Sequence, residues 1–574
     1  MSEEQVVVFS DFGVVYRGPE AEALRDVAFA LRRGEMVAVL GASNAGKSTL
    51  LKCVNRLVPE LKQAEIRGDL HVLGRDARDL RVADLAGRVG FVFQDFEAQL
   101  FSTNVQEEML FGLEQLGIPP AEMAERVRSA LAAVGLAGFE RRDPTTLSGG
   151  EKQRLAIGAV LALRPELWLL DEPSTDLDPT GREELFELLG RMRGKGPRDL
   201  FPETVPGTVS ATLLVVEHDV EAVTGADRWL VLRKGEVALE GRPVDLLAEP
   251  DALAALGVRP PELARVCHAL GLPPHELDVD AVAAELRGRG VGLQSRPLAA
   301  SAPSREARTL LEVRGIRFRY EGQAVDALAG VDFVLREGEF VALLGANGSG
   351  KSTLARLMTG ILRPGSGDVL WRDRRLDELT AAERAGAVGY VFQNPDDQIF
   401  AATVEEEIAF GPMQMGWSAD ELGARVRAVL VAVDLCGLER RDPFLLGKGE
   451  RQRTAVASIL ALRPEVLILD EPTTGLDFPE QKALMDALAR LNRSGQTIVM
   501  ITHVPWVVAA YARRAMLLQS GEKLWDGPVR ELFANEELCR RGGFLPPEVA
   551  RLAARLGGTA LTVEELLDDL RGRT

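Results

Sequence analysis

Short apolar runs without alternating polar positions recur along the chain, and each ends at a polar loop. Met36–Leu40 and Phe340–Leu344 precede glycine-rich segments, whereas Leu167–Leu170 and Val466–Leu469 precede paired acidic residues. Such a run is typical of a strand buried on both faces, as in a parallel sheet covered by helices. The pattern therefore predicts an α/β fold.

The glycine-rich segments follow the P-loop pattern G-x-x-x-x-G-K-[ST]. Gly41–Ser48 reads GASNAGKS, and Gly345–Ser352 reads GANGSGKS 304 positions later. Each follows a predicted strand and leads into a predicted helix, which is the context that the motif requires. Backbone N–H groups and the positive end of the helix dipole would then surround phosphate groups. The nucleotide contacts predicted for the two loops are Gly41, Asn44, Gly46, Lys47, Ser48, Thr49, Gly345, Gly348, Gly350, Lys351, Ser352 and Thr353.

Two side-chain types in these loops have separate expected roles. We expect Lys47 and Lys351 to reach the terminal phosphates of the nucleotide. We expect Ser48 and Ser352 to ligate Mg²⁺ through their hydroxyl groups.

The paired acids supply the other half of such a site. Asp171 and Asp470 follow their strands directly, and α/β sheets place ligands at the carboxyl ends of strands. We expect these two carboxylates to hold Mg²⁺ through water. Glu172 and Glu471 come next and are the candidate bases that polarise the attacking water.

Composition narrows the class of protein. The chain has 574 residues, of which 46% are hydrophobic and 27% charged, so it is long enough for roughly three to four globular domains. A net charge of −18 weighs against a nucleic-acid partner. Four cysteines lie far apart and indicate neither disulfides nor a metal cluster. Without an 18-residue apolar run or a signal-peptide pattern, we expect a soluble polypeptide.

Internal repetition divides the chain. The acidic pairs recur after 299 positions, but the histidines His218 and His503 are only 285 apart, so the first copy holds about 14 extra residues, most simply within 193–210. After each copy, a short segment recurs: VRPPELARV (258–266) resembles FLPPEVARL (544–552). The predicted organisation is a first domain at 4–245, a helical appendix at 246–293, a linker at 294–308, a second domain at 309–530 and a second appendix at 531–574.

The role of the appendices is open at this stage. Their acidic amphipathic ends suit either simple packing on the parent domain or a role in binding a partner or in dimerisation.

A third motif is the most specific. Leu147–Arg154 reads LSGGEKQR, and Ser148, Gly149 and Gly150 open a predicted helix, so a hydroxyl and several N–H groups would face one anion. With this motif, nearly the whole chain resembles a tandem pair of ABC-type nucleotide-binding domains. The resemblance implies two P-loop NTPase domains, each with a helical subdomain, paired head to tail. ATP with Mg²⁺ would lie between the P-loop of one domain and the signature helix of the other.

The resemblance also assigns roles to matched pairs of residues. They are the Q-loop residues Gln94 and Gln393, counted among the Mg²⁺ ligands, the D-loop residues Asp178 and Asp477, the switch histidines His218 and His503, and the adenine-stacking residues Tyr16 and Tyr320. Each of these tyrosines stands 25 residues before the first glycine of its P-loop.

The second signature is altered. It reads LGKGERQR, with Gly447 at the position of Ser148, Lys448 at that of Gly149, and Gly449 after it. Because each ATP would meet the signature of the opposite domain, the loss falls on the first P-loop. A hydrogen bond to a charged group contributes about 1.5–3 kcal/mol, so turnover there should slow by about 10- to 100-fold. The Lys448 ammonium could recover part of the phosphate contact. The alternative is that the altered signature reflects sequence drift, with little difference in activity between the two sites.

The segments that follow the Q-loops narrow the type of ABC ATPase that the chain resembles. Phe93–Gly112 and Phe392–Gly411 share the frame FQ-x-x-x-x-Q-x-F-x-x-x-V-x-x-E-x-x-FG, which resembles ATPases of energy-coupling factor (ECF) and cobalt/nickel importers. The resemblance implies a peripheral position on the cytoplasmic face of the inner membrane, a transmembrane T component and a substrate-binding membrane S component. The cargo would be a vitamin, its precursor or a divalent metal. At 95–97 the first copy departs from this frame, so its membrane contact is expected to differ.

Two other classes stay open. One is a soluble tandem ABC ATPase acting on ribosomes or nucleic acid, and the other is the ATPase of another ABC transporter class. For the acidic segment 405–407, docking of basic ends of the membrane partner and a solvated helix face are alternatives.

Overall fold

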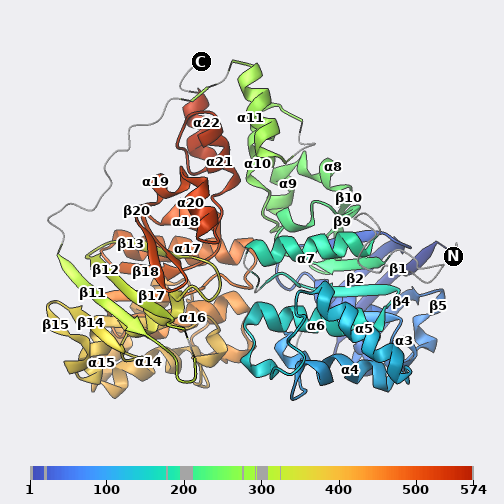
Figure 1. Cartoon of the computed structure of the whole chain (residues 1–574), viewed down its shortest axis with the longest axis horizontal. Coiled ribbons are helices and arrows are strands. Elements are labelled where there is room, and N and C mark those ends of the chain that lie inside the picture. Colours follow the sequence, from blue (N-terminus) through green and yellow to red (C-terminus); the bar gives the residue numbers. More distant parts are fainter. Residues whose placement is uncertain are drawn as a thin grey trace. The chain divides into compact units, whose positions relative to one another are not determined.

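A computed structural model describes residues 4–17, 22–175, 177, 179–193, 211–273, 277–290, 292–293, 308–323 and 325–571. The chain divides into two units, one of residues 1–264 with 273–275 and one of residues 265–272 with 276–574. Figure 1 shows a mixed sheet with covering helices in each. The predicted α/β fold is confirmed.

The first unit is built on a six-stranded sheet in the order β10-β9-β3-β8-β7-β6. Its strands pair in parallel, except for β9 with β10. All residues of β3, β7 and β8 are buried, as the unbroken apolar runs predict. These strands are β3 (Met36–Leu40), β6 (Val89–Val92), β7 (Leu167–Asp171), β8 (Thr212–Val216), β9 (Arg228–Arg233) and β10 (Glu236–Gly241).

A second, antiparallel sheet packs its apolar side against this one in a shared core. It contains β1 (Gln5–Tyr16), β2 (Glu22–Arg32), β4 (Ala64–Val72) and β5 (Arg75–Asp76). The helices of the unit are α1 (Lys47–Val54), α2 (Leu57–Glu60), α3 (Val82–Leu85), α4 (Val105–Gln115), α5 (Pro120–Ala133), α6 (Gly149–Leu163), α7 (Pro179–Met192), α8 (Pro243–Leu247) and α9 (Pro250–Ala255). Helices α4, α5 and α6 contact one another and form a helical subdomain.

The second unit repeats this plan, with the sheet order β16-β17-β18-β13-β19-β20 beside the antiparallel sheet β12-β11-β14-β15. Its strands are β11 (Thr309–Phe318), β12 (Leu328–Arg336), β13 (Phe340–Leu344), β14 (Ser366–Trp371), β15 (Arg374–Arg375), β16 (Val388–Val391), β17 (Val466–Asp470), β18 (Thr497–Ile501), β19 (Arg514–Gln519) and β20 (Glu522–Pro528). Its ATPase-domain helices are α12 (Lys351–Met358), α13 (Ala381–Ala387), α14 (Val404–Gln414), α15 (Ala419–Ala432), α16 (Lys448–Ala461), α17 (Phe478–Arg493), α18 (Pro505–Tyr511) and α19 (Val529–Phe533).

The second appendix shares the core of its own domain. It contains α20 (Glu536–Arg541), α21 (Glu548–Arg555) and α22 (Val563–Arg571). Phe544, Ala550 and Leu561 belong to the same buried cluster as residues of β13 and β17. Packing on the parent domain is therefore one role of this appendix.

Whereas α8 and α9 belong to the first unit, two later helices of the first appendix fall wholly or mainly in the second unit. They are α10 (Glu262–Leu270) and α11 (Val279–Gly288), and α11 packs on α21. Arg555 Nε lies 2.7 Å from Asp280 Oδ1, and the N–H of Leu293 donates to the carbonyl of Leu556 over 2.7 Å. The two appendices therefore touch each other within this unit, with exposed ion pairs at the edge of the contact. In the described ranges, no helix is both long and apolar enough to cross a membrane.

Candidate functional site

Both P-loops have the backbone form that only glycine takes readily. Gly41 and Gly46 have φ values of 139° and 101°, and Gly345 and Gly350 have 143° and 102°. A Cβ atom on Gly41 would overlap the carbonyl of Leu232, because the loop passes close to β9. The glycines therefore let each loop turn between its strand and its helix.

The two P-loop lysines are held against their own loops. Lys47 Nζ donates to the carbonyls of Gly41 and Ala42, both over 2.9 Å, and Lys351 repeats this with Gly345 and Ala346. Both lysines are only 6% exposed. Each ammonium group is thus fixed inside the turn that the motif assigns to phosphate.

In each unit the structure joins two of the three predicted Mg²⁺ ligands, the serine and the aspartate, but not the Q-loop glutamine. Ser48 Oγ donates to Asp171 Oδ1 over 2.9 Å, and Ser352 Oγ donates to Asp470 Oδ1 over 3.1 Å. Burial and the adjacent charge of Glu172 raise the pKa of Asp171 to about 6. A cation would relieve this desolvated carboxylate, and hydroxyl and carboxylate oxygens are ligands that Mg²⁺ accepts. The residues present therefore fit the metal in both units.

Each candidate base contacts its switch histidine. Glu172 Oε1 lies 2.6 Å from His218 Nε2, and Glu471 Oε2 lies 3.1 Å from His503 Nδ1. Both glutamates are in the left-handed region, with φ of 52° and 47°. Backbone strain of this kind is concentrated at functional sites.

The surroundings of the two bases differ. Both Q-loop glutamines are exposed, but Gln94 Nε2 donates to Glu172 Oε2 over 2.8 Å, whereas no hydrogen bond joins Gln393 to Glu471 in the part of the chain that the structure describes. Burial acts to raise the pKa of Glu471, but the charge and hydrogen bond of His503, together with Lys351, outweigh it and the pKa is lowered. Glu471 is therefore ionised at neutral pH, as a base must be.

The two predicted stacking tyrosines lie beside their P-loop helices. Tyr16 and Thr49 join their hydroxyl groups over 3.1 Å, and Tyr320 and Thr353 do so over the same distance. Each ring is thus held next to the residue that follows the P-loop serine.

The signature helices begin differently. Ser148 is the N-cap of α6, and its hydroxyl donates to Glu151 Oε2 over 2.9 Å while its N–H donates to the same oxygen over 2.8 Å. In the second motif, Gly447 is the N-cap of α16, and Gly449 lies in the first turn of this helix. Gly447 has only its backbone N–H to offer, which donates to Glu450 Oε2 over 3.1 Å. The first turn of α16 therefore offers no hydroxyl where Ser148 offers one.

Of the two predicted D-loop aspartates, only Asp477 lies in the described residues. Asp477 is buried as the N-cap of α17 and accepts the N–H of Glu480 over 2.8 Å. Asp178 lies outside the described residues, as does most of the predicted linker 294–308.

For Glu407, both predicted roles are wrong. It is neither a docking charge nor a solvated residue, because it is 3% exposed and accepts the N–H groups of Phe400 and Ala401 over 3.0 and 2.9 Å. Glu405 and Glu406 are exposed. The buried carboxylate fixes the loop that follows the Q-loop.

Two residues with consequences for the sites were missed from the sequence. Tyr390 on β16 donates its hydroxyl to Asp470, and Glu217 is buried beside the switch histidine His218. The signal for both was a difference between otherwise matching motifs: Tyr390 aligns with Phe91, and Glu217 with Thr502.

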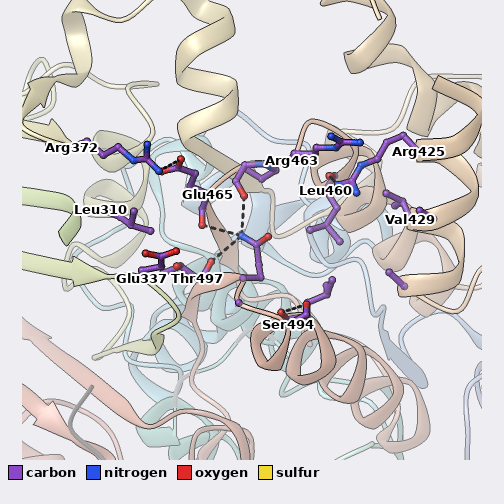
Figure 2. A pocket seen from close by; sticks show the side chains of 16 residues that line it. Leu310, Glu337, Arg372, Arg425, Val429, Leu460, Arg463, Glu465, Ser494 and Thr497 are labelled. Atoms are coloured by element: carbon purple, nitrogen blue, oxygen red, sulfur yellow. Dashed lines mark hydrogen bonds and ion pairs between the residues drawn. The ribbon is translucent and has the colours of Figure 1, made fainter. Parts of the chain in front are cut away.

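A cavity of about 390 Å³ in the second unit lies apart from these residues. Arg372, Arg425, Arg463 and Glu465 face it from α15 and the turns around it, and Thr497 at the start of β18 closes it (Figure 2). Asp470 and Lys351 stand at the opposite, carboxyl ends of the strands, and no predicted site residue lines the cavity. The predicted nucleotide-binding residues therefore lie outside this cavity.

Comparison with known proteins agrees with the geometry. Residues 24–175 and 328–474 each match the ABC transporter family. A protein of Caldanaerobacter subterraneus subsp. tengcongensis, provisionally described as an ABC transporter ATP-binding protein, is 40% identical, with 99% of both chains covered. A relative from Methanosarcina mazei with the same description is 38% identical over 99% of this chain and 98% of its own.

Two solved structures are also similar over one domain. CbiO1 of Clostridium perfringens, described as part of the ABC transporter complex CbiONQ, is 33% identical with a TM-score of 0.38, covering 41% of this chain and 94% of that one. A dimeric ATP-binding cassette bound to ADP and Pi is 27% identical with a TM-score of 0.36, covering 38% and 99%. By its two matched domains and its full-length relatives, the chain belongs to the ABC transporter family and is a tandem ABC ATPase.

Proposed function

We propose that this chain is the energy-coupling ATPase of an ECF-type importer, bound peripherally to the cytoplasmic face of the membrane. Its two halves would pair head to tail, and a transmembrane T component would convert their closure on ATP into movement. A membrane S component would carry a vitamin, a vitamin precursor, cobalt or nickel.

The observation that carries this proposal is an exposed aromatic pair beside each Q-loop. Phe101 and Phe111 form an edge-to-face pair with ring centroids 4.7 Å apart, and Phe400 and Phe410 form the same pair over the same distance. Phe101 is 62% exposed and Phe400 is 60% exposed. Large apolar side chains held in water at matching places favour an interaction surface.

The loops that carry these rings are fixed rather than free. Glu108 accepts the N–H groups of Phe101 and Ser102 over 3.0 and 2.8 Å, which repeats the contacts of Glu407 in the second unit. A buried carboxylate thus holds each phenylalanine outward. Such pre-organisation lowers the entropy cost of docking a partner helix.

Within each half, the roles of the residues follow from their contacts. Lys351 would bind the terminal phosphates, and Glu471, oriented by His503, would accept the proton of the attacking water. Ser352 and Asp470 would hold Mg²⁺, which supplies positive charge against the phosphate oxygens. Lys47, Glu172, His218, Ser48 and Asp171 would do the same in the first half.

The two composite ATP sites would be unequal. The second P-loop would meet Ser148, but the first would meet Gly447, which has no hydroxyl to offer. ATP would therefore turn over mainly at the second P-loop while the first retains nucleotide longer.

The test is affinity purification of the tagged full chain from solubilised membranes of the cells that encode it. We expect an integral membrane protein to co-purify, and expect Phe101→Ser with Phe400→Ser to reduce its recovery at least about 10-fold with ATP binding unchanged. Leu61→Ser with Val431→Ser is the matched control, because these residues are 75% and 64% exposed but lie outside the Q-loop frames. Sedimentation with ribosomes and no membrane partner would instead favour the soluble class.

A further inference from the structure

Tyr390 and Asp470 meet across two neighbouring strands of the second unit. Strands β16 and β17 run parallel, with Tyr390 opposite Ile468 in the register, two residues before Asp470. The Tyr390 hydroxyl donates to Asp470 Oδ2 over 2.6 Å, and both residues are buried. Since Ser352 donates to Oδ1, both oxygens of this carboxylate are fixed by neutral donors.

A third residue holds the tyrosine. Arg356 of α12 forms a side-chain hydrogen bond with Tyr390, and its charge also acts on Asp470. The hydroxyl therefore has one acceptor and one donor in place, and its proton is directed at Asp470.

The first unit lacks this arrangement. Phe91 takes the same place on β6, opposite Leu169 in the parallel register, two residues before Asp171. A phenyl ring donates no hydrogen bond. In the described part of that unit, the only side chain that donates to Asp171 is Ser48, and Lys52 stands where the second unit has Arg356.

We propose that Tyr390 is a positioning residue of the second metal–nucleotide site, one that fixes the Asp470 carboxylate with one oxygen turned towards Ser352. The first unit has no such support, so its Asp171 would be less well oriented towards a cation. This inference rests on the proposed function only in taking Asp470 as a Mg²⁺ ligand. It adds a second, independent source of inequality to the altered signature, located in the P-loop half of each site.

Reciprocal variants test the proposal in the full chain. Tyr390→Phe is made with Lys47→Ala, which disables the first P-loop, and Phe91→Tyr is made with Lys351→Ala. The readout is Mn²⁺ binding, followed by electron paramagnetic resonance with a non-hydrolysable ATP analogue. Loss of a residue that orients a metal ligand typically lowers metal affinity about 10- to 100-fold. We expect Tyr390→Phe to raise the Mn²⁺ Kd to that extent and Phe91→Tyr to lower it.

A second measurement separates positioning from general damage. Analogue binding in EDTA should stay within about 2-fold for Tyr390→Phe, because the hydroxyl contacts the carboxylate and not the nucleotide. Unchanged Mn²⁺ affinity would overturn the proposal, as would an equal loss of binding in EDTA. These results do not depend on any membrane partner, so a failed co-purification leaves them interpretable.

Discussion

Glu471 Oε2 lies 3.1 Å from Nδ1 of His503, and in the first half Glu172 Oε1 lies 2.6 Å from Nε2 of His218. Local geometry thus gives both halves a base and a histidine. The proposed inequality between the two sites rests chiefly on the signature that each site would meet.

Replacement of the two bases measures that inequality. We expect Glu471→Gln to lower steady-state ATP hydrolysis of the full chain by about 10- to 100-fold, down to the rate of the first P-loop, because the amide cannot accept a proton from water. Glu172→Gln should cost less than about 5-fold, since the first P-loop contributes little of the turnover. Equal losses in the two variants would contradict the proposed asymmetry.

The signature serine offers a reciprocal exchange. Ser148→Gly should slow hydrolysis at the second P-loop by about 10- to 100-fold, as expected for one charge-assisted hydrogen bond. Gly447→Ser, placed in a Glu471→Gln background, should raise hydrolysis at the first P-loop by a similar factor. Single-turnover rates with radiolabelled ATP provide the measurement.

The same exchange has a small effect on folding. Glycine is nearly as good an N-cap as serine, so Ser148→Gly should cost only a few tenths of a kcal/mol in stability.

If Gly447→Ser leaves the rate of hydrolysis at the first P-loop unchanged, Lys448 already supplies the phosphate contact that the hydroxyl would make.

The tyrosines separate stacking from hydrogen bonding. Tyr320→Phe removes only the contact with Thr353 and should change ATP affinity by less than about 2-fold. Tyr320→Ala removes the ring and should weaken binding by about 5- to 150-fold, since stacking on a base contributes roughly 1–3 kcal/mol. Equilibrium binding of ATP and GTP in a Lys47→Ala background tests this, and similar losses for both purines are expected.

Much of the fold follows from local sequence, because its signals are local. Unbroken runs such as Val466–Leu469 predict buried parallel strands, and glycines at 41 and 345 mark turns that no other residue adopts readily. The pairing of Ser48 with Asp171 follows from the known behaviour of strand ends. The matching repeats made each of these predictions stronger than a single motif would.

What could not be predicted depends on contacts between distant segments. Glu407 lies in a run of three acids that reads as a solvated face, but its loop folds back and buries it. Tyr390 appears as one apolar position in a strand until its neighbour Asp470 is known. The packing of α11 on α21 joins residues some 270 positions apart, and no local pattern encodes that distance.

Glu217 gives the first unit a pH-dependent group at a position where the second unit has a neutral side chain. It is buried and accepts the N–H of Ser174 over 3.1 Å, and burial raises its pKa to about 8. In the second unit, the neutral Thr502 occupies this position. The folded state therefore holds a proton that the unfolded chain, with a pKa near 4.5, has already released. Because the folded pKa is the higher one, this group costs stability as pH rises from about 4.5 to 8.

Replacing Glu217 with glutamine should remove this dependence of stability on pH. Glu217→Gln keeps the size of the side chain and an oxygen for Ser174, so at pH 5 we expect little change. At pH 8 the variant should be more stable, since each unit of pKa difference corresponds to about 1.4 kcal/mol. Hydrogen exchange of the peptide that contains β8, measured from pH 5 to 8 and corrected for intrinsic rates, reports on this site directly. Glu125→Gln, at an exposed position of the same unit, is the control. The same pH slope in Glu217→Gln as in the parent chain would show that Glu217 is ionised in the folded protein.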